Sequence, residues 1–363
     1  MKALAARLPV KNNFLGIDLG TTSIKVVELA RSKRGLELVN YGMLEARNHL
    51  ERINDSIQTS GLEIMDSETV ELLGMLLRQM RISTKEVAAS LPAFAVFTSL
   101  LELPDMAVQE TAQAIQYQSR SLVPVSIDEV SIDWLQVGRY RNKEGHALQR
   151  VVLVAVPKRQ IEKYRKIFAQ AGLDLKVLEL ETISLARVLT KGDPTLTLIV
   201  DIGARSTAFS MARDGAMIHS SQADFAGSSL TYALSRGLSI NVLRAEELKK
   251  QKGLMGTGGE YEVSTLMLPY LDVIINEAKR VIEGYERNHQ ERVDRIVLSG
   301  GGADLLGIEK YVAGSLKLPT VKADPLGTGI NYPEESAPAI KGAAPALAVA
   351  LGLGVKPFWE NSK

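Results

Sequence analysis

Two stretches of the chain share one hydrophobic and polar pattern, in which a short apolar run ends at an aspartate and a small polar turn leads into a second apolar run. They are FLGIDLGTTSIKVVEL at residues 14–29 and LTLIVDIGARSTAFS at residues 196–210. Short apolar runs that carry β-branched residues predict buried strands, and the small polar turns between them predict tight hairpins. Because the pattern returns in the same strand–turn–strand context, we predict an internal duplication.

The turn of the first stretch has the composition of an anion-binding site. Gly20, Thr21 and Thr22 would present backbone N–H groups and hydroxyls to one point, which suits a phosphate. Lys25 adds a positive charge, and Asp18 is suited to face a hydrated Mg²⁺ ion, which prefers carboxylates and retained waters. No helix follows the glycine, so the stretch is neither a Walker loop nor a dinucleotide fingerprint.

A second copy of this hairpin changes what the first one predicts. Two such hairpins facing each other would hold a polyphosphate from both sides, with Asp18 and Asp201 directed at one metal ion. The alternative for either stretch alone is an ordinary hairpin within a sheet.

The elements expected around the two hairpins indicate an α/β fold with an inserted unit. From residue 86 to residue 180 the predicted strands and helices form a compact α+β unit between two halves of a larger fold. Other strands are expected over 36–44, 216–221 and 295–298, and helices over 66–80, 181–189, 227–237, 242–252, 266–291, 303–316 and 345–353, before a frayed tail at 357–363. Three glycines, Gly300–Gly302, join the 295–298 strand to the next helix and leave room for a flat ring, although a plain strand–helix connection is the alternative.

Composition narrows the classes of partner. The net charge of +1 gives no global field that favours nucleic acid, and the basic hairpin at 139–150 has too few aromatic residues for a nucleic-acid surface. The chain has no cysteine, which excludes disulfide scaffolds, thiolate zinc sites and cysteine nucleophiles. The N-terminal segment lacks an apolar core of signal-peptide length, and the longest uncharged run, 342–355, is too short to cross a bilayer. We therefore expect a soluble protein.

Four segments in order make the chain resemble the actin-like ATPases: GIDLGTTSIKV at 16–26, VDIGARST at 200–207, AEELKK at 245–250 and SGGGADLLGIEKY at 299–311. The resemblance spans about residues 14–355. The placement of the inserted block, with LELPDM at 101–106 and VVLVAVPK at 151–158, is similar to that in the PilM family of type IV pilus assembly proteins and in its relative FtsA.

This resemblance implies an α/β, ribonuclease-H-like duplicated, two-domain actin-like fold with an inserted α+β subdomain. The implied division is a first subdomain at 14–85 completed by 342–355, an inserted interaction subdomain at 86–180, and a second domain at 181–341 with 241–291 as its helical nucleotide-capping part.

The resemblance also implies ATP and Mg²⁺ as cofactors and a role for each matching residue. Asp18 and Asp201 would hold Mg²⁺ through waters, and Glu181 would position the attacking water. The implied contacts to the β- and γ-phosphates are Gly20, Thr21, Thr22 and Lys25 from one side and Gly203, Ser206 and Thr207 from the other. The implied contacts to the ribose, base edge and adenosine are Glu246, Lys249, Gly300, Gly301 and Gly302.

Two positions limit what the resemblance implies for hydrolysis. Ala204 and Arg205 stand where many relatives have glycine or an acidic residue, and Arg205 would either clamp a phosphate or crowd the turn. Glu181 has an alternative role as a carboxylate that offsets the dipole of the helix it begins. We therefore expect at most weak ATPase activity.

The expected function is a cytoplasmic ATP-binding scaffold of the type IV pilus assembly machinery, peripheral to the inner face of the cytoplasmic membrane through its partners. The implied partner is the cytoplasmic N-terminal peptide of the inner-membrane protein PilN, captured in extended form between the first domain and the inserted unit, beside other pilus assembly components. The β-rich segments 97–103 and 151–156 are the candidate strand edges, and self-association into a homo-oligomer is the alternative use of the unit.

Two rival functions carry less support from the residues. An FtsA-like filament protein of cell division would end in a basic amphipathic membrane helix, which residues 356–363 do not encode. A small-molecule kinase of the same superfamily would need a further catalytic aspartate and a substrate pocket, for which no extra motif is present.

Overall fold

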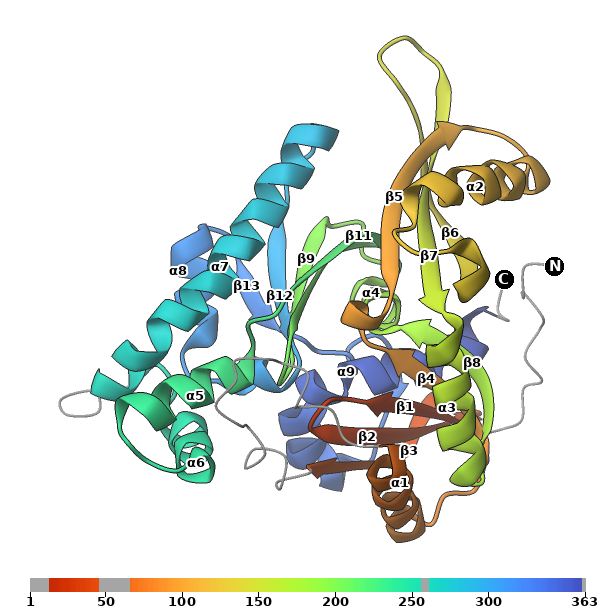
Figure 1. Ribbon diagram of the computed structural model, residues 1–363. Helices are drawn as coiled ribbons and strands as arrows, with labels where there is room; N and C mark the ends of the chain where they lie inside the picture. The colour runs from red at the N-terminus through yellow and green to blue at the C-terminus, as the bar shows by residue number, and fades with distance from the viewer. Residues whose placement is uncertain (1–12, 46–65, 256–260, 361–363) are drawn as a thin grey trace.

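Two mixed β-sheets organise the computed structural model, which describes residues 13–45, 66–255 and 261–360 (Figure 1). The first sheet has the order β14 (Ile330–Asn331), β3 (Gly35–Glu45), β2 (Ser23–Ser32), β1 (Asn13–Leu19), β4 (Glu86–Leu91) and β8 (Asp174–Leu180). The second has the order β11 (Ala216–Ala223), β10 (Thr207–Arg213), β9 (Thr197–Ile202), β12 (Arg295–Ser299) and β13 (Thr320–Lys322).

The two sheets repeat one topology. In the first, β1, β2 and β3 are antiparallel neighbours, while β4 and then β8 continue the sheet in parallel. In the second, β9, β10 and β11 are antiparallel neighbours, while β12 and then β13 continue it in parallel. The predicted internal duplication and the actin-like α/β fold are therefore confirmed.

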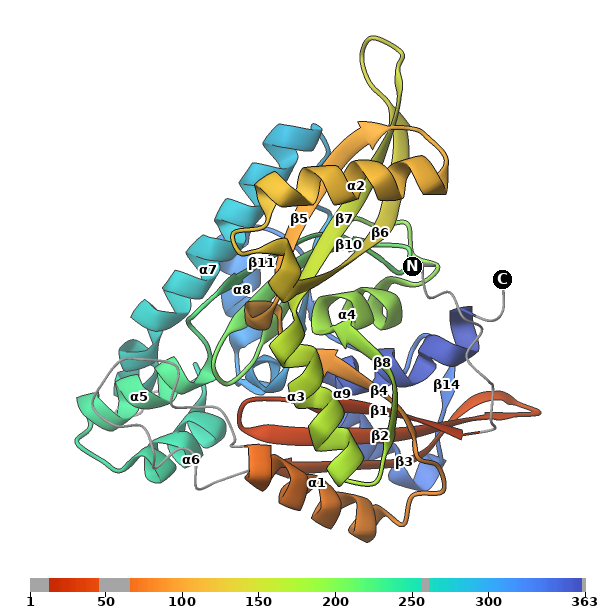
Figure 2. The ribbon, with the colours of Figure 1, turned by 45° about the vertical axis from the view of Figure 1, so that its right-hand side comes forward.

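Helices cover both sheets and fill the space between them. The helix α4 (Glu181–Thr190) leads from the first sheet to the second, and α9 (Ala337–Glu360) packs against α4, β1 and β2. Beneath the first sheet, α1 (Asp66–Met80) and α3 (Lys158–Gln170) lie side by side, as Figure 2 shows. The second sheet carries α5 (Gly227–Gly237), α6 (Val242–Lys252), α7 (Tyr261–His289) and α8 (Ile308–Leu316).

The last helix is much longer than the segment 345–353 predicted from its small residues. It reaches Glu360 because Phe358 is buried at its end, which agrees with the alternative to a frayed tail, that Phe358 and Trp359 dock on the fold. The backbone of this helix packs directly against the backbones of β1 and α4, with glycine at each contact. A β-carbon at Gly16 would lie 2.0 Å from the Ala350 carbonyl oxygen, and one at Gly352 would lie 2.1 Å from the Ser184 carbonyl oxygen. The stretch Glu334–Trp359 is long and apolar enough, by length and composition, to cross a membrane, and 72% of its most apolar window is buried inside the fold.

The strands in the range 86–180, predicted as one inserted unit, belong to two different sheets. A separate three-stranded sheet has the order β5 (Phe97–Pro104), β7 (Ala147–Pro157), β6 (Val130–Arg141), and α2 (Val108–Leu122) packs on it. The strands β4 and β8 pair within the first sheet instead, and α3 packs on α1. A run such as EVAASL, buried along its whole length, predicts a strand but not the sheet to which it belongs.

The module, as we call residues 97–157, has an outer and an inner face. Along its central strand, Val151, Leu153 and Ala155 join the core that α2 completes, whereas Val152 and Val154 belong to the core of the main body. This alternation follows from the two-residue period of a strand. The module is therefore docked on the body through one face of its sheet.

The helix predicted over 303–316 begins later than expected. A 3₁₀ turn covers Gly301–Asp304, and Gly307 has a φ of 86°, a conformation that glycine adopts without strain. The regular helix α8 therefore starts only at Ile308.

Candidate functional site

A cavity of about 520 Å³ lies between the two sheets and is bordered by the turns of both predicted hairpins. Fourteen of the fifteen residues predicted for the site line it, although they come from distant parts of the chain. They are Asp18, Gly20, Thr21, Thr22, Lys25, Glu181, Asp201, Gly203, Ser206, Glu246, Lys249, Gly300, Gly301 and Gly302.

The two turns have the same backbone geometry. The Gly20 N–H donates to the Ser23 carbonyl oxygen at 2.9 Å, and the Gly203 N–H donates to that of Ser206 at 3.1 Å. A β-carbon at Gly20 would lie 3.0 Å from the Ser23 oxygen, and one at Gly203 would lie 2.9 Å from the Ser206 oxygen. Both turns therefore need glycine at the same place, because any side chain would crowd the carbonyl that closes the turn.

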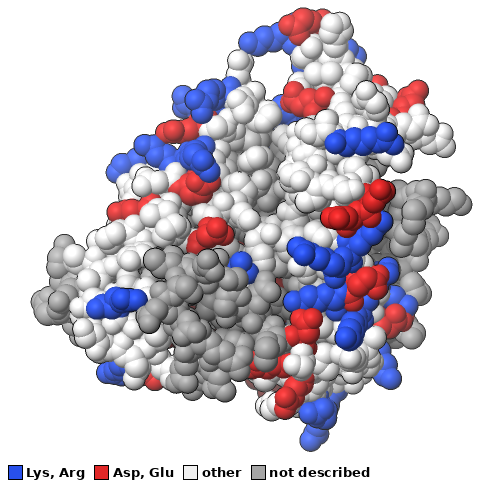
Figure 3. All heavy atoms as spheres, in the orientation of Figure 1, with Lys and Arg blue, Asp and Glu red and all other residues white. Residues whose placement is uncertain are grey.

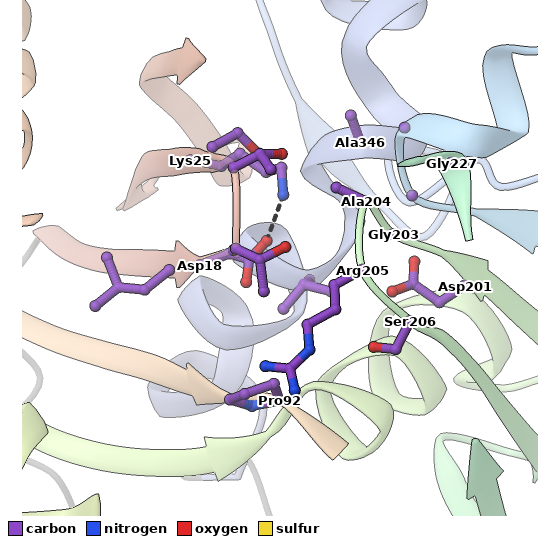
Figure 4. Close-up of a pocket in the computed structure, with 18 of the residues that line it drawn as sticks. Asp18, Lys25, Pro92, Asp201, Gly203, Ala204, Arg205, Ser206, Gly227 and Ala346 are labelled. Atoms are coloured by element: carbon purple, nitrogen blue, oxygen red, sulfur yellow. Dashed lines mark hydrogen bonds and ion pairs between the residues drawn. The ribbon is translucent and has the colours of Figure 1, made fainter. Parts of the chain in front are cut away.

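Asp18, at the end of β1, is held from two sides. Its Oδ2 accepts from the Lys25 ammonium at 2.7 Å (Figure 4). Its Oδ1 accepts from the Ser90 hydroxyl at 2.7 Å. Burial alone would lower the pKa of Lys25, but the carboxylates of Asp18, Asp201 and Glu181 outweigh it and raise that pKa above its ordinary value. Lys25 therefore stays charged at the floor of the cavity.

Asp201, at the end of β9, faces the same space with fewer partners. Its Oδ1 is buried and accepts no hydrogen bond. Burial, together with the nearby charge of Asp18, raises the pKa of Asp201 to about 6, against the opposing effect of Lys25. An unpartnered buried carboxylate oxygen is a ready ligand for a cation or its bound water.

Glu181, the first residue of α4, is the third carboxylate at this point. Its Oε1 accepts from the Ala93 N–H at 2.9 Å. Burial and the charge of Asp201 raise its pKa to about 8, so this carboxyl is largely protonated at neutral pH. Three carboxyl groups around one lysine form an acidic site that a divalent cation would balance.

Among the described residues, no group of three or more His, Cys, Asp or Glu side chains is arranged to hold a metal ion directly. The chemistry of Asp18 and Asp201 nevertheless fits a hydrated Mg²⁺, since that ion retains several waters and needs only one or two carboxylates. The buried orphan oxygen of Asp201 is the observation that carries this fit.

On the opposite wall, Glu246 and Lys249 form a buried pair on α6. The Lys249 ammonium lies 2.6 Å from Glu246 Oε2 and donates to the Thr231 hydroxyl at 2.8 Å and to the Gly227 carbonyl at 3.0 Å. Burial lowers the pKa of Lys249 despite the adjacent carboxylate. The pair has polar groups at the cavity wall and a fixed geometry, which suits recognition of hydroxyl groups.

Thr207 does not line the cavity, so the cavity lining gives no support to its predicted contact with a phosphate. Its side chain is fully buried behind the second turn, and its hydroxyl donates to the Phe225 carbonyl oxygen at 2.7 Å. The alternation of a strand decides this, because Thr207 is the first residue of β10 and points to the opposite face from the cavity.

The three glycines line the cavity for different reasons. β-Carbons at Gly300 and Gly302 would lie 2.6 Å from the Ile202 carbonyl oxygen and 2.3 Å from the Ile202 Cγ2, respectively. Gly301 has open space instead. Close packing against the end of β9 therefore requires two of these glycines, and the third leaves the cavity wall open.

Sequence reasoning missed Ser90 and Phe94. Ser90 holds Asp18, and the Phe94 ring lies 4.3 Å from the Arg205 guanidinium carbon, stacked on it across the cavity. Both come from the end of β4 and the 3₁₀ turn η3 (Ala93–Ala95) that follows it. Only the pairing of β4 with β1 brings this segment to Asp18, and a single sequence does not contain that pairing.

The surface adds no second electrostatic site on the side that Figure 3 shows. Over the right-hand part of that face, near α3, basic and acidic side chains are interspersed. They form no extended surface of one sign there, and a nucleic-acid partner would require one.

Comparison with known proteins places the chain in a family. Residues 16–358 match the family described as type IV pilus assembly protein PilM. The chain belongs to this family. Its fold is similar to that of a solved "PilM-PilN type IV pilus biogenesis complex", with a TM-score of 0.79 and 20% identity over 97% of this chain and 99% of the other.

More distant solved structures share the actin-like fold. The ethanolamine utilization protein EutJ from Carboxydothermus hydrogenoformans has a TM-score of 0.57 and 17% identity, over 96% of this chain and 90% of its own. MreB 5 of Spiroplasma citri, solved bound to AMPPNP, has a TM-score of 0.55 and 15% identity, over 98% of this chain and 100% of its own.

Among relatives by sequence, the cell division protein FtsA of Enterococcus faecalis is 24% identical over 339 residues, which cover 81% of this chain and 74% of that protein. This likeness agrees with the expected kinship between the two branches. The family match, which extends over nearly the whole chain, assigns the protein to pilus assembly rather than to cell division.

Proposed function

We propose that this protein is an ATP-binding scaffold of the type IV pilus assembly machinery, and that it binds the nucleotide with Mg²⁺ between its two phosphate hairpins. The observation that carries the proposal is the facing pair of identical glycine turns, each preceded by an aspartate directed into one cavity. The AMPPNP-bound state of the MreB 5 relative supports the same use of the fold.

Each part of the cavity has a role in this proposal. Asp18 and Asp201 would hold Mg²⁺ through its waters, and that ion would neutralise phosphate charge. The turns at Gly20 and Gly203 would donate N–H groups to the β- and γ-phosphates, helped by the charge of Lys25. The helical part at 241–291, which carries Glu246 and Lys249, would cap the nucleoside beside Gly301.

The carboxyl of Glu181 supports weak hydrolysis at most. A general base must be ionised to take a proton from water, and the raised pKa of Glu181 keeps much of this group protonated at neutral pH. The ligand would then act chiefly by favouring one arrangement of the two domains, which requires differential affinity and not turnover.

We propose a three-part division close to the one predicted from the sequence. The first domain comprises 14–85 and 342–355, together with β4, α3 and β8 at the margins of the range 86–180. The second domain comprises 181–341. The module between them, residues 97–157, is the interaction unit, since it adds no residue to the predicted nucleotide site.

The module would capture the cytoplasmic N-terminal peptide of a PilN-like inner-membrane protein, which would place this protein in the cytoplasm at the membrane's inner face. The segment 151–156 is excluded as the accepting edge, because β7 is paired on both sides, to β5 and to β6. The outer strands β5, which contains the predicted edge 97–103, and β6 pair with no strand other than β7 in the described part of the chain, and of these two open edges we propose that of β6. Adding a strand to such an edge gives affinity through main-chain hydrogen bonds.

One residue marks the side of β6 on which the peptide would lie. Leu135 pairs with Val152, so both side chains are on the sheet face that turns toward the main body. Val152 is buried there, whereas Leu135 remains 37% exposed at the margin. An apolar side chain at the open margin of a buried face suits a pocket for an incoming peptide side chain.

Two measurements test the proposal. Calorimetry of Mg²⁺-dependent ATP binding should show loss of binding in Asp18→Ala and in Asp201→Ala, while Asp193→Ala, which alters a carboxylate outside the cavity lining, keeps wild-type affinity. Wild-type affinity in both cavity variants would refute the nucleotide site.

The second measurement is fluorescence anisotropy with a labelled PilN N-terminal peptide. Leu135→Asp should weaken binding by at least about tenfold, a loss of about 1.4 kcal/mol. Leu122→Asp on α2, with the same 37% exposure, is the matched control and should leave it unchanged. If Leu135→Asp instead retains the peptide and abolishes only self-association in sedimentation, the module mediates oligomerisation and the docking assignment is wrong.

A further inference from the structure

The connection between β4 and the module touches the cavity from the first domain's side. Pro92, Phe94 and Ala95 line the cavity, and Phe97 begins β5 only two residues later. The Ala93 N–H donates to Glu181 Oε1 at 2.9 Å. Any displacement of this connection is therefore transmitted directly to the first strand of the module.

From the second domain, Arg205 reaches the same connection. It stands in the second glycine turn, two residues after Gly203, and Figure 4 shows its side chain directed toward Pro92. Its guanidinium carbon lies 4.3 Å from the centre of the Phe94 ring, which is a cation–π contact. The contact joins a phosphate turn of one domain to the module's connection in the other.

We infer that Arg205 distinguishes ATP from ADP and reports the difference to the module through Phe94. This inference rests on the proposed nucleotide site. A charge-assisted hydrogen bond to a phosphate is stronger than stacking on an aromatic ring, so a γ-phosphate beside the second turn draws the guanidinium off Phe94. With ADP that phosphate is absent, and Arg205 stays on the ring.

Release of Phe94 removes a contact that joins η3 to Arg205 of the second domain, while the hydrogen bond from Ala93 to Glu181 remains. The start of β5 can then move relative to the second domain, and the position of the module on the main body changes. Linkage makes the effect reciprocal: ATP alters the affinity for the partner peptide by the same factor by which the peptide alters the affinity for ATP.

Three variants test this in the full-length protein. Arg205→Gln removes the charge, Phe94→Leu removes the ring while keeping an apolar side chain, and Arg236→Gln is the control, since Arg236 stacks on Tyr232 at 5.0 Å within α5. For each, the affinities for ATP and ADP are measured with Mg²⁺, as is the affinity for the PilN peptide with and without ATP. Thermal melting with saturating ADP verifies that each variant is folded.

The two test variants are expected to act in opposite directions on ATP. Arg205→Gln should lower the affinity for ATP by about tenfold relative to that for ADP, because only the γ-phosphate contact is lost. Phe94→Leu should strengthen ATP binding severalfold relative to ADP binding, because the ring no longer competes for Arg205. In both, the effect of ATP on peptide affinity, at least about fivefold in the wild type, should disappear. Arg236→Gln should behave as the wild type.

Hydrogen exchange gives a readout that needs no peptide. In the wild type, amides of 91–97 should exchange faster with ATP than with ADP, and in Phe94→Leu the two nucleotides should give the same rate. Equal losses of ATP and ADP affinity in Arg205→Gln, or an unchanged ATP effect on peptide affinity in both variants, would overturn the inference while leaving the nucleotide site standing. Failure of the wild type to bind either nucleotide would instead refute the proposed function itself.

Discussion

The two phosphate hairpins are alike in backbone and different in charge. In the first, Asp18 pairs in register with Lys25, whereas the residue that pairs with Asp201 in the second is Ala208. A serine on the neighbouring parallel strand bonds each aspartate, Ser90 to Asp18 and Ser299 to Asp201, but only Asp201 keeps an oxygen, Oδ1, without a partner. Duplication has kept the concavity and let the side chains diverge.

Because their charges differ, the two hairpins would contribute differently to ligand binding. The first hairpin brings its own cation, which satisfies Asp18 before any ligand arrives. The second hairpin leaves the buried Oδ1 of Asp201 without a partner, so a cation from outside the chain would have to neutralise it. A site that is neutralised on one side and open on the other can bind a metal–phosphate complex in one orientation.

The largest effect is expected from removing the charge of the first hairpin. Lys25→Met leaves three buried carboxyl groups, those of Asp18, Glu181 and Asp201, without a cation. Breaking a buried ion pair by removing one partner costs about 3–5 kcal/mol of unfolding free energy. Urea unfolding should show a loss of this order, and ATP binding should fall by more than about 100-fold, which is 2.7 kcal/mol.

An ion pair at the mouth of the cavity provides the control for Lys25→Met. Lys250 lies 3.2 Å from Glu45 across the two domains, and both side chains are about half exposed. Lys250→Met should therefore cost at most about 1 kcal/mol. Similar losses in the two variants would mean that the Lys25–Asp18 pair has no special role in the site.

A smaller effect is expected from neutralising the second hairpin, and its sign depends on pH. The folded-state pKa of Asp201, about 6, lies above the ordinary aspartate value of 3.8. The stability that this group contributes is fully present below about pH 4 and is lost as pH rises through 6. Without Mg²⁺, Asp201→Asn should therefore be more stable than the wild type at pH 7.5, by about 3 kcal/mol, and nearly equal to it at pH 4.

Denaturant titrations at both pH values, with and without Mg²⁺ and ATP, check this. The wild type should gain stability from the ligand at pH 7.5, and Asp201→Asn should not. Asp193→Asn serves as the contrast, because the hydrogen bonds from Thr195 and the nearby Arg295 lower the pKa of Asp193, so its loss should destabilise the protein at neutral pH. A variant at position 201 that is less stable than the wild type at pH 7.5 would contradict the raised pKa of this carboxyl group.

Much of the two hairpins can be predicted from the sequence alone. Apolar runs ending at Asp18 and Asp201 predict the strands, the turns and the duplication, because these are local patterns with a two-residue or turn-specific period. The actin-like resemblance then places Glu181, Glu246 and Gly300–Gly302 at one site, although they lie far apart in the chain. Of the fifteen residues predicted for the nucleotide site, fourteen line one cavity.

What the sequence did not predict is set by pairing between distant strands. Whether β4 and β8 belong to the module or to the first sheet depends on their partners, and a fully buried strand looks the same in either. The same pairing brings Ser90 to Asp18 and Phe94 to Arg205. The length of α9 likewise depends on the burial of Phe358, which only the assembled core provides.

The smallest expected effect separates the hydroxyls of the two hairpins. Thr22 lines the cavity, whereas Thr207 is buried behind it and donates to the Phe225 carbonyl oxygen. Replacement by valine keeps the shape and removes only the hydroxyl.

Thr22→Val should therefore weaken ATP binding by a few-fold, the value of one hydrogen bond of about 1 kcal/mol, with unfolding free energy unchanged. Thr207→Val should do the reverse: it leaves ATP binding unchanged and lowers the unfolding free energy by about 0.5–1.5 kcal/mol, because the Phe225 carbonyl loses its donor. Calorimetry and urea unfolding of the two variants side by side measure both quantities. A loss of ATP affinity in Thr207→Val equal to that in Thr22→Val would show that both hydroxyls face the ligand, and the two hairpins would then be equivalent in their side chains as well as in their backbones.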